Sequence, residues 1–299
     1  MRRSGTVAER YSVENTPEHI ASFLDSLSVK RPVIGSEATA EYHLSLARAC
    51  LKRHIPFRLL NPIITKQFTR ATVRKRKTDR DDAEIIGRCL LQGAGREIRG
   101  EELLPGARIL RTTADLRHMA QSLKQKRVRY EEHFPECLAV QEALLKAEQA
   151  LAESAKVLMG EGAACASKKE RELLTSIPGI GKDLSAIIAL EVGDASRFPG
   201  GKQLVAYAGL DPKVRQSGKI LNVNTKITKR GSPYLRRALY LAASIAQRHD
   251  PALKAYYLKK RNEGKRYKEA TVANARKLTH RVLATLKRGT PYVLAPLST

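Results

Sequence analysis

Residues 174–189 of this chain read LTSIPGIGKDLSAIIA, which predicts a helix–hairpin–helix. Pro178 ends the first helix, Gly179 and Gly181 permit a tight turn, and the second helix begins near Lys182. The first backbone N–H groups of a helix have no partners within it, so Gly179, Gly181 and Lys182 are candidates for binding a nucleic-acid phosphate. PGIG turns also occur as purely structural connections between helices, and that alternative stays open.

The composition favours a polyanionic partner. The chain has 299 residues, with 55 Lys plus Arg against 30 Asp plus Glu, and a formal net charge of +25. Nucleic acid is therefore the leading class of partner. A membrane surface is the weaker alternative, because basic membrane-binding helices need large apolar anchors, whereas aromatic residues make up 5% of this chain and Trp is absent. No apolar run has the length needed to span a bilayer.

The N-terminal residues and the cysteines indicate a cytoplasmic protein. The first residues, MRRSGTVAERYSV, contain no apolar signal core. The four cysteines are widely scattered and form no CxxC pair, so we expect reduced thiols and no zinc site. These cysteines are Cys50, Cys89, Cys137 and Cys165.

Residues 1–106 are predicted to be an α/β domain, because strand-like and helix-like runs alternate there. A helix is expected to begin at Asn15 or Thr16, with Pro17 in its first turn. A strand–helix–strand unit is expected to follow it. The expected elements are strands at 6–14, at 32–36 ending at Glu37, and at 57–60, with helices at 15–27, at 41–53 and from Asp79.

The rest of the chain is predicted to be mainly helical. In residues 107–160, leucines and other apolar residues recur at helical spacing, and Pro135 interrupts them, which predicts a long antiparallel helical hairpin. Residues 160–170 (GEGAACASKKE) are predicted to be a linker. The mainly α C-terminal domain at 171–299 contains the helix–hairpin–helix, and Ser232 is expected to cap a helix there.

Three acids in the α/β part are candidates for binding a divalent metal. Glu37 ends a predicted strand, and α/β sheets place their sites at the carboxyl ends of strands. Asp79 and Asp82 are three residues apart at a helix start, so their side chains share one face. Carboxylate oxygens are ligands that Mg²⁺ prefers. Alternatively, Asp79 caps the helix, Asp82 interacts with its positive end, and Glu37 is a loop acid.

Two basic segments are candidates for contacting phosphates. The first precedes the helix-start acids and either binds phosphates or forms a solvated charge run; it consists of Arg74, Lys75, Arg76 and Lys77. The second is the loop around Ser217, in which Lys213, Arg215 and Lys219 could stabilise the charge that develops when a serine attacks phosphorus. Taken alone, the residues around Ser217 fit an ordinary Ser-Gly turn better than a nucleophile.

In their order along the chain, these motifs resemble the bacterial insertion-sequence transposases of the one-ten family. That family is similar to pilin-gene invertases and includes the bridge-RNA-guided recombinases. The resemblance covers nearly the whole chain. It is carried by the stretches VIGSEATAEYH, LNPIITKQFTRA, KTDRDDAE, LLTSIPGIGKDLSAIIALEVGD, FPGGKQLVAYAGLDPKVRQSG and KRGSPYLRRALYLAA.

The resemblance implies an RNase-H-like (RuvC-like) N-terminal domain whose Asp-Glu-Asp-Asp set binds Mg²⁺. A helical hairpin connects it to a transposase domain in which a serine forms a covalent link to the cut DNA strand. By motif, Glu37 matches the family Glu, Asp79 and Asp82 match the last two Asp, and Ser217 matches the nucleophile. The implied partners are donor and target DNA, a structured guide RNA and further copies of the chain, as a dimer or tetramer at the nucleoid.

One family element does not carry over to this sequence. The family's first Asp lies on an opening strand, before the strand that aligns with TVAERYSVEN, and we expect the α/β domain of this chain to be incomplete and its metal binding weakened. The leading hypothesis is a transposase of the site-specific recombinase type that uses Ser217 and Mg²⁺. The alternative is an N-terminally truncated, inactive remnant that still binds nucleic acid. A metal-only junction resolvase ranks last.

Overall fold

The computed structural model of the chain describes residues 1, 4–39, 41–71, 79–98, 105–212, 216–217, 220–221 and 226–294. These residues are mostly helical, with one three-stranded and one two-stranded sheet. The chain divides into two compact units, Met1–Leu103 and Leu104–Thr299. In the described parts, no helix combines the length and the apolar character needed to cross a membrane.

The first unit is built on a small mixed sheet with strand order β1-β2-β3. Strands β1 (Ile34–Glu37) and β2 (Phe57–Leu60) are parallel, and helix α2 (His43–Lys52) makes the crossover between them. The short β3 (Arg96–Glu97) pairs antiparallel with β2. The predicted strand–helix–strand unit is therefore confirmed, with Glu37 as the last residue of its strand.

The helices of the first unit have local signals in the sequence. In α1 (Pro17–Asp25), Pro17 occupies the first turn, and the Thr16 side chain accepts a hydrogen bond from the backbone N–H of His19. Its buried Ile20 and Leu24 pack with residues of α2 and β2 in one hydrophobic cluster. Two further helices complete the unit, α3 (Pro62–Ala71) and α4 (Asp79–Leu91).

Two predictions for regular structure are wrong. Residues 6–14 form no strand. Their apolar side chains are exposed, Tyr11 by 60%, so this segment lacks the buried face that an alternating strand would have. The predicted linker at 160–170 is mostly helical. Gly162 does not break its helix; a Cβ there would lie 2.5 Å from the Leu110 side chain, so the glycine allows two helices to approach closely.

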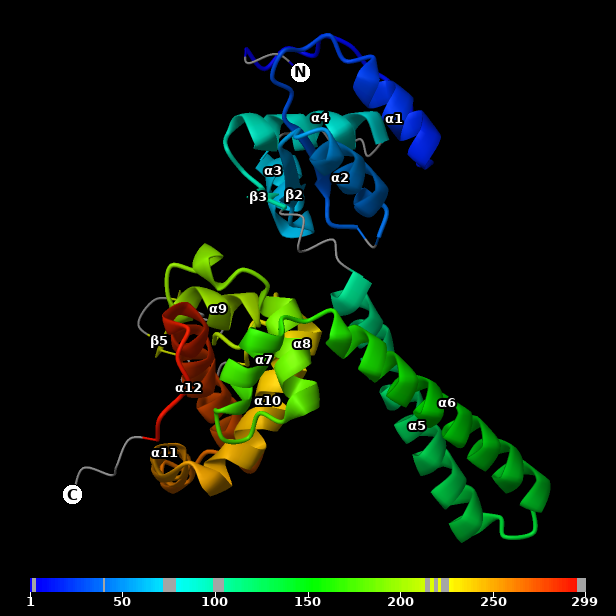
Figure 1. Ribbon diagram of the computed structural model, residues 1–299, viewed down its shortest axis with the longest axis vertical. Helices are drawn as coiled ribbons and strands as arrows, with labels where there is room; N and C mark the ends of the chain where they lie inside the picture. The colour runs from blue at the N-terminus through cyan, green and yellow to red at the C-terminus, as the bar shows by residue number, and fades with distance from the viewer. Residues whose placement is uncertain are drawn as a thin grey trace. The chain divides into compact units, whose positions relative to one another are not determined.

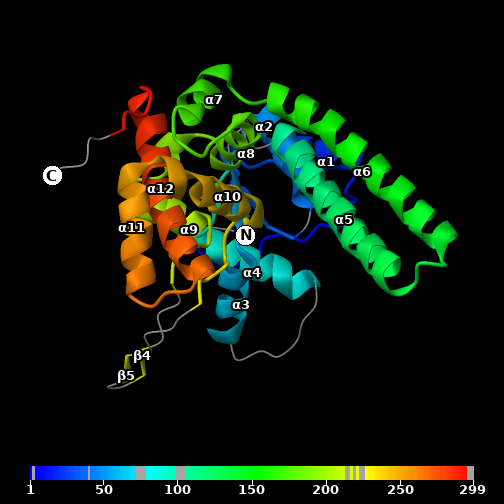
Figure 2. The same cartoon turned by 90° about the horizontal axis from the view of Figure 1, so that it is seen from below.

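The second unit begins with the predicted helical hairpin. Helices α5 (Pro105–His133) and α6 (Leu138–Ala164) lie side by side and antiparallel, as both Figure 1 and Figure 2 show. The break between them falls at Pro135, as the sequence predicted. Arg127 of α5 bonds Glu148 of α6 across the pair at 3.2 Å.

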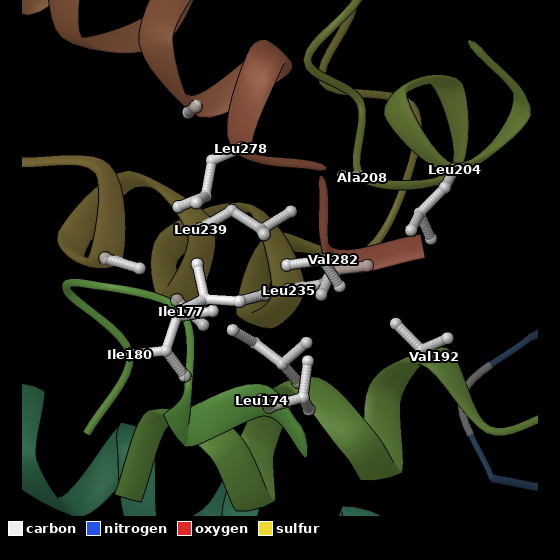
Figure 3. Packing of buried hydrophobic residues seen from close by; sticks show 14 of the residues in the cluster. Leu174, Ile177, Ile180, Val192, Leu204, Ala208, Leu235, Leu239, Leu278 and Val282 are labelled. Atoms are coloured by element: carbon white, nitrogen blue, oxygen red, sulfur yellow. The ribbon is translucent and has the colours of Figure 1, made fainter. Parts of the chain in front are cut away.

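The remainder of the second unit is a mainly helical body around one large core. Figure 3 shows how side chains far apart in sequence, such as Leu174, Leu235 and Leu278, meet in this core, and each is fully buried. The predicted cap at Ser232 is confirmed. The elements of the body are α7 (Lys168–Thr175), α8 (Lys182–Val192), η2 (Ala195–Arg197), α9 (Gly201–Tyr207), β4 (Gln216–Ser217), β5 (Ile220–Leu221), α10 (Pro233–His249), α11 (Pro251–Asn262) and α12 (Tyr267–Arg288).

Candidate functional site

Glu37 lies half-buried at the carboxyl end of β1 and is held by two hydroxyl groups. The Thr39 hydroxyl donates to Oε1 at 2.9 Å, and the hydroxyl of the buried Thr65, in the first turn of α3, donates to Oε2 at 2.6 Å. These two donors orient the carboxylate. An oriented carboxylate supplies oxygen ligands of the kind that a hard cation such as Mg²⁺ prefers.

The other two predicted metal ligands lie at the start of α4. This helix begins at Asp79, as predicted, and Asp82 is exposed in its first turn. The side chain of Asp79 is not among those described. Among the described side chains, which do not include Asp79, no group of three His, Cys, Asp or Glu residues is placed to hold a metal ion, and the predicted set of three acids stays a prediction. The predicted phosphate contacts Arg74, Lys75, Arg76 and Lys77 lie outside the described residues.

The turn between α7 and α8 is packed against α10 on one side and open on the other. Gly179 has φ +91°, and a Cβ on it would lie 2.3 Å from the carbonyl oxygen of Ala242. Gly181 caps α8 with an ordinary φ of −83°, and a Cβ on it would meet nothing within 4 Å. The open side of this turn therefore exposes the first residues of α8, including Lys182.

A basic residue of the α5–α6 helical hairpin contacts the exposed start of α8. Arg117 of α5 donates to the carboxylate of Asp183 at 2.9 Å, and both side chains are about half-exposed. This ion pair partly neutralises the one acid in the first turn of α8. The start of α8 therefore has Lys182 on its own helix and a guanidinium from α5 beside it.

Ser217 lies on a narrow two-stranded ribbon. Strands β4 and β5 are antiparallel, with Ser217 opposite Ile220, so two residues separate the partners. Nearer the helices, Pro212 pairs with Ile227 in the same antiparallel sense. Only the backbone of Ser217 is described, and the predicted cations Lys213, Arg215 and Lys219 lie outside the described residues.

Backbone hydrogen bonds fix the two roots of the segment that carries the ribbon. The N–H of Thr228 donates to the carbonyl of Asp211 at 2.8 Å, and the N–H of Ser232 donates to the carbonyl of Tyr207 at 2.9 Å. A Cβ at Gly231 would lie only 1.7 Å from the Tyr207 oxygen, so this close approach requires glycine. The segment therefore leaves and re-enters the helical body at one place, between α9 and α10.

The start of α10 also belongs to a buried polar junction. The Glu191 side chain is 2% exposed and accepts two hydrogen bonds from Arg111, at 2.6 and 3.1 Å, and one from the Ser232 hydroxyl at 2.6 Å. Burial is the largest single effect on the pKa of Arg111 and lowers it, but the hydrogen bonds and charge of Glu191, together with Tyr207 and Tyr234, hold the pKa above its usual value. This junction ties α5, α8 and α10 together beside the root of the Ser217 segment.

A second contact and a small pocket adjoin the junction. The Tyr234 hydroxyl donates to the carboxylate of Asp115 on α5, at 3.0 Å to Oδ2. The pocket has a cavity volume of about 90 Å³ and mostly apolar walls. It is lined by Leu110, Arg111, Thr113, Ala114, Arg117, Leu184, Ile187, Glu191, Tyr234, Arg237, Ala238 and Leu241.

The sequence did not point to several of these residues. Thr65 supports Glu37 from 28 positions away, and Arg111 reaches Glu191 from 80 positions away. No local pattern indicates either contact. Ser232 was predicted as a helix cap, but its second role as a donor to Glu191 depends on tertiary packing.

Two family models match this chain. The model described as "Transposase", of the DEDD IS110 type, matches residues 1–139. The model described as "Transposase IS116/IS110/IS902 family" matches residues 171–258, a range that includes the α7–α8 turn, the Ser217 ribbon and α10. Glu37, Asp79 and Asp82 fall in the first match.

Curated relatives agree with these models. An insertion element IS110 protein of 43.6 kDa from Streptomyces coelicolor is 35% identical over 120 residues, which are 40% of this chain and 29% of the relative. The pilin gene-inverting protein of Moraxella bovis is 34% identical over 121 residues, 40% of this chain and 38% of the relative. The transposase for insertion sequence element IS1111A of Coxiella burnetii is 26% identical over 274 residues, 80% of this chain and 73% of the relative.

Proposed function

Because the chain belongs to the IS116/IS110/IS902 family of transposases, we propose that it cuts and rejoins DNA strands, as a transposase or site-specific recombinase, with Ser217 as the nucleophile. The observation that carries the proposal is the ribbon. In it the backbone of Ser217 pairs with that of Ile220, on a segment whose roots are fixed between α9 and α10. A narrow ribbon on a fixed base is suited to bringing one hydroxyl to a DNA backbone.

In the proposed reaction, the Ser217 oxygen attacks a backbone phosphorus. A serine oxygen–phosphorus bond forms while the bond from phosphorus to a deoxyribose oxygen breaks. The serine proton passes to a base, and the departing deoxyribose oxygen takes up a proton. Attack by another deoxyribose hydroxyl then reverses these steps and rejoins the strand. Lys213, Arg215 and Lys219 would stabilise the charge on the phosphate oxygens.

The acids of the first unit supply the second part of the proposal. We propose that Glu37, Asp79 and Asp82 hold Mg²⁺ within a RuvC-like domain, and that Thr39 and Thr65 keep the Glu37 carboxylate oriented for it. When bound, the ion would neutralise negative charge on the scissile phosphate. The support is the oriented carboxylate at the carboxyl end of β1, where α/β sheets place their sites.

Nucleic-acid binding is proposed for the α7–α8 turn in the role of a helix–hairpin–helix. Gly181 and Lys182 would contact a phosphate through backbone N–H groups and the ammonium group. Arg74, Lys75, Arg76 and Lys77 would contact DNA near the acids. A structured guide RNA and a dimer or tetramer of the chain complete the proposal, and both come from the family resemblance.

The test is a search for a covalent serine–DNA adduct. The protein is incubated with DNA of its own insertion element, the adjoining transcribed RNA and Mg²⁺, and is then separated by denaturing electrophoresis. We expect an adduct that Ser217→Ala abolishes and Ser154→Ala retains. Ser154 is a matched control because it is exposed on α6 and its hydroxyl bonds only within its own helix, to Ala150.

Two outcomes would contradict the proposal. An adduct that persists in Ser217→Ala would assign the nucleophile to another residue. DNA cleavage that Ser217→Ala leaves unchanged, without any adduct, would favour a reaction that depends on the metal site alone.

A further inference from the structure

The last two long helices carry a large share of the positive charge of the chain. Residues 251–288, which include α11 and α12, contain twelve Lys and Arg residues and only two acids. That difference of ten charges is two fifths of the net charge of +25, in about an eighth of the sequence. All of these residues are described.

The packing of α12 turns this charge outward. Its apolar side is fully used in the core, where Ala275, Leu278 and Val282 are 0% exposed. The basic residues occupy the remaining sides of α11 and α12. We call the exposed ones the α11–α12 basic surface: Lys254, Lys259, Arg261, Arg266, Lys268, Arg276, Lys277, Lys287 and Arg288.

Tyr256 joins the basic sides of the two helices. The Lys277 ammonium of α12 lies 3.9 Å from the centre of the Tyr256 ring, and the Lys260 ammonium of α11 lies 5.4 Å from it. The two ammonium groups are therefore no farther apart than the sum of these distances. Such cation–π contacts attract the two ammonium groups to the same aromatic ring.

The two acids of this segment do little to neutralise the surface. Glu263 is bound by Lys260, at 2.7 Å, and Glu269 accepts a hydrogen bond from the backbone N–H of Arg266 at the start of α12. Gathering so many like charges opposes the folded state unless a partner of opposite charge offsets the repulsion. The surface therefore fits a polyanion.

We propose that the α11–α12 basic surface binds the phosphodiester backbone of nucleic acid, through residues that neither the α7–α8 turn nor the Ser217 ribbon shares. This inference goes beyond the proposed strand chemistry, because backbone binding here needs neither Ser217 nor a metal ion. It adds a further nucleic-acid-binding surface to those proposed at the α7–α8 turn and the Ser217 ribbon.

The aromatic side chains decide between contact with the backbone and contact with the bases. A single-strand platform stacks bases on free aromatic faces. Here the Tyr256 ring is covered by Lys277, and Tyr267, which contacts Tyr257 edge to face with ring centres 6.1 Å apart, is 44% exposed, so one exposed ring stands beside nine exposed Lys and Arg residues. A membrane partner would need a free apolar side on α12, and that side lies in the core.

The test compares two triple variants that remove the same charge from different places. The first, Lys259→Gln/Arg276→Gln/Lys277→Gln, lies on the α11–α12 basic surface. The control, Lys124→Gln/Lys126→Gln/Arg129→Gln, removes three exposed charges from α5. Both are made in full-length protein that also carries Ser217→Ala, so that covalent capture does not contribute. Affinity for a labelled 25-base-pair duplex of random sequence is measured by fluorescence anisotropy across a salt series.

We expect the surface variant to bind at least tenfold more weakly at about 0.1 M salt, and its salt slope to fall by about 2 to 3, because each lost phosphate contact removes about 0.9. The control should stay within threefold of the parent. Equal weakening in both variants would show an effect of net charge alone and would overturn the proposal, as would no weakening in either.

Further arms separate the sources of phosphate and guard against misfolding. Duplex DNA, duplex RNA and single-stranded DNA should all lose affinity, whereas a loss confined to single strands would indicate base stacking and contradict backbone binding. The charge-preserving variant Lys259→Arg/Lys277→Arg should bind within threefold of the parent. Since no arm depends on the serine, failure here and failure of the adduct test are distinguishable.

Discussion

Two glycines in one turn have different structural duties. Gly179 combines a left-handed φ of +91° with backbone atoms of α10 where a side chain would go. Gly181, two residues later, has an ordinary φ and open space around it. Composition alone does not distinguish them, because both belong to the same PGIG motif.

Gly179→Ala is expected to lower the free energy of unfolding by about 3 kcal/mol, from the left-handed backbone and from crowding against Ala242. Gly181→Ala, the matched control, is expected to cost less than about 1 kcal/mol. Urea unfolding followed by circular dichroism measures both. Equal losses would mean that the turn does not pack on α10 as described.

A single buried thiol, that of Cys50, makes the stability of the fold depend on pH. Burial raises the pKa of Cys50 to about 11 from an ordinary value of 9.0, although the positive charge of Arg53 opposes the rise. The unfolded thiol loses its proton first, so the folded state loses stability as the pH rises from about 9 through 11, and keeps it below 9. We expect Cys50→Ala to flatten this decline, and Cys165→Ala, an exposed control, to leave it unchanged, in urea unfolding measured at pH 8 and pH 10.

At the scale of elements, the Glu191 junction joins the hairpin to the helical body. Its carboxylate contacts α5 through Arg111 and the start of α10 through Ser232. Removing Arg111 leaves the carboxylate of Glu191, whose side chain is 2% exposed, buried without its charged partner, which is far more costly than losing an exposed pair.

Arg111→Ala is therefore expected to lower the free energy of unfolding by about 3–5 kcal/mol. Asp183→Ala, which breaks the half-exposed pair with Arg117, is expected to change it by less than about 1 kcal/mol. Chemical denaturation of each variant decides. Similar small losses for both would contradict the buried geometry of Glu191.

The elements that the sequence predicted correctly have local causes. The start of α1 at the Thr16 cap, the end of β1 at Glu37 and the break at Pro135 each follow from neighbouring residues. Helix α3 was not among the predicted elements. The sequence predicted that the helix ends near Gly160, but α6 continues beyond it. Gly162 allows close packing against Leu110, a residue distant in the sequence, so no local pattern indicated its role.

The candidate site was predictable to a smaller extent. The position of Glu37 at a strand end came from pattern, and the interest of Ser217 came from family resemblance. The hydroxyl support from Thr65 and the root of the Ser217 segment depend on contacts between elements distant in the sequence. Such contacts produce no periodic pattern in the sequence from which they could be predicted.

At the scale of the whole molecule, the second unit has its own core. Its largest cluster of buried residues runs from Leu110 on α5 to Leu283 on α12 and contains no residue of the first unit. A unit that closes its own core has the main requirement for folding alone.

Residues 104–299, expressed alone, are expected to unfold in one cooperative transition and to keep the binding contribution of the α11–α12 basic surface. Calorimetry and the same anisotropy assay measure the two properties. A broad, non-cooperative transition would show that the second unit depends on the first for its stability.

The segment that carries Ser217 is closed where Asp211 meets Thr228, and this closure affects how related proteins can diverge in sequence. The two end residues close the segment through a backbone hydrogen bond and through a bond from the Thr228 hydroxyl to the Asp211 carboxylate, so the closure tolerates most changes of side chain in between. Evolution could therefore lengthen, shorten or recharge the intervening stretch while the frame of α9 and α10 persists. A chimera that received this stretch from a relative would keep the melting temperature of its host and, under the proposed function, acquire the DNA preference of its donor.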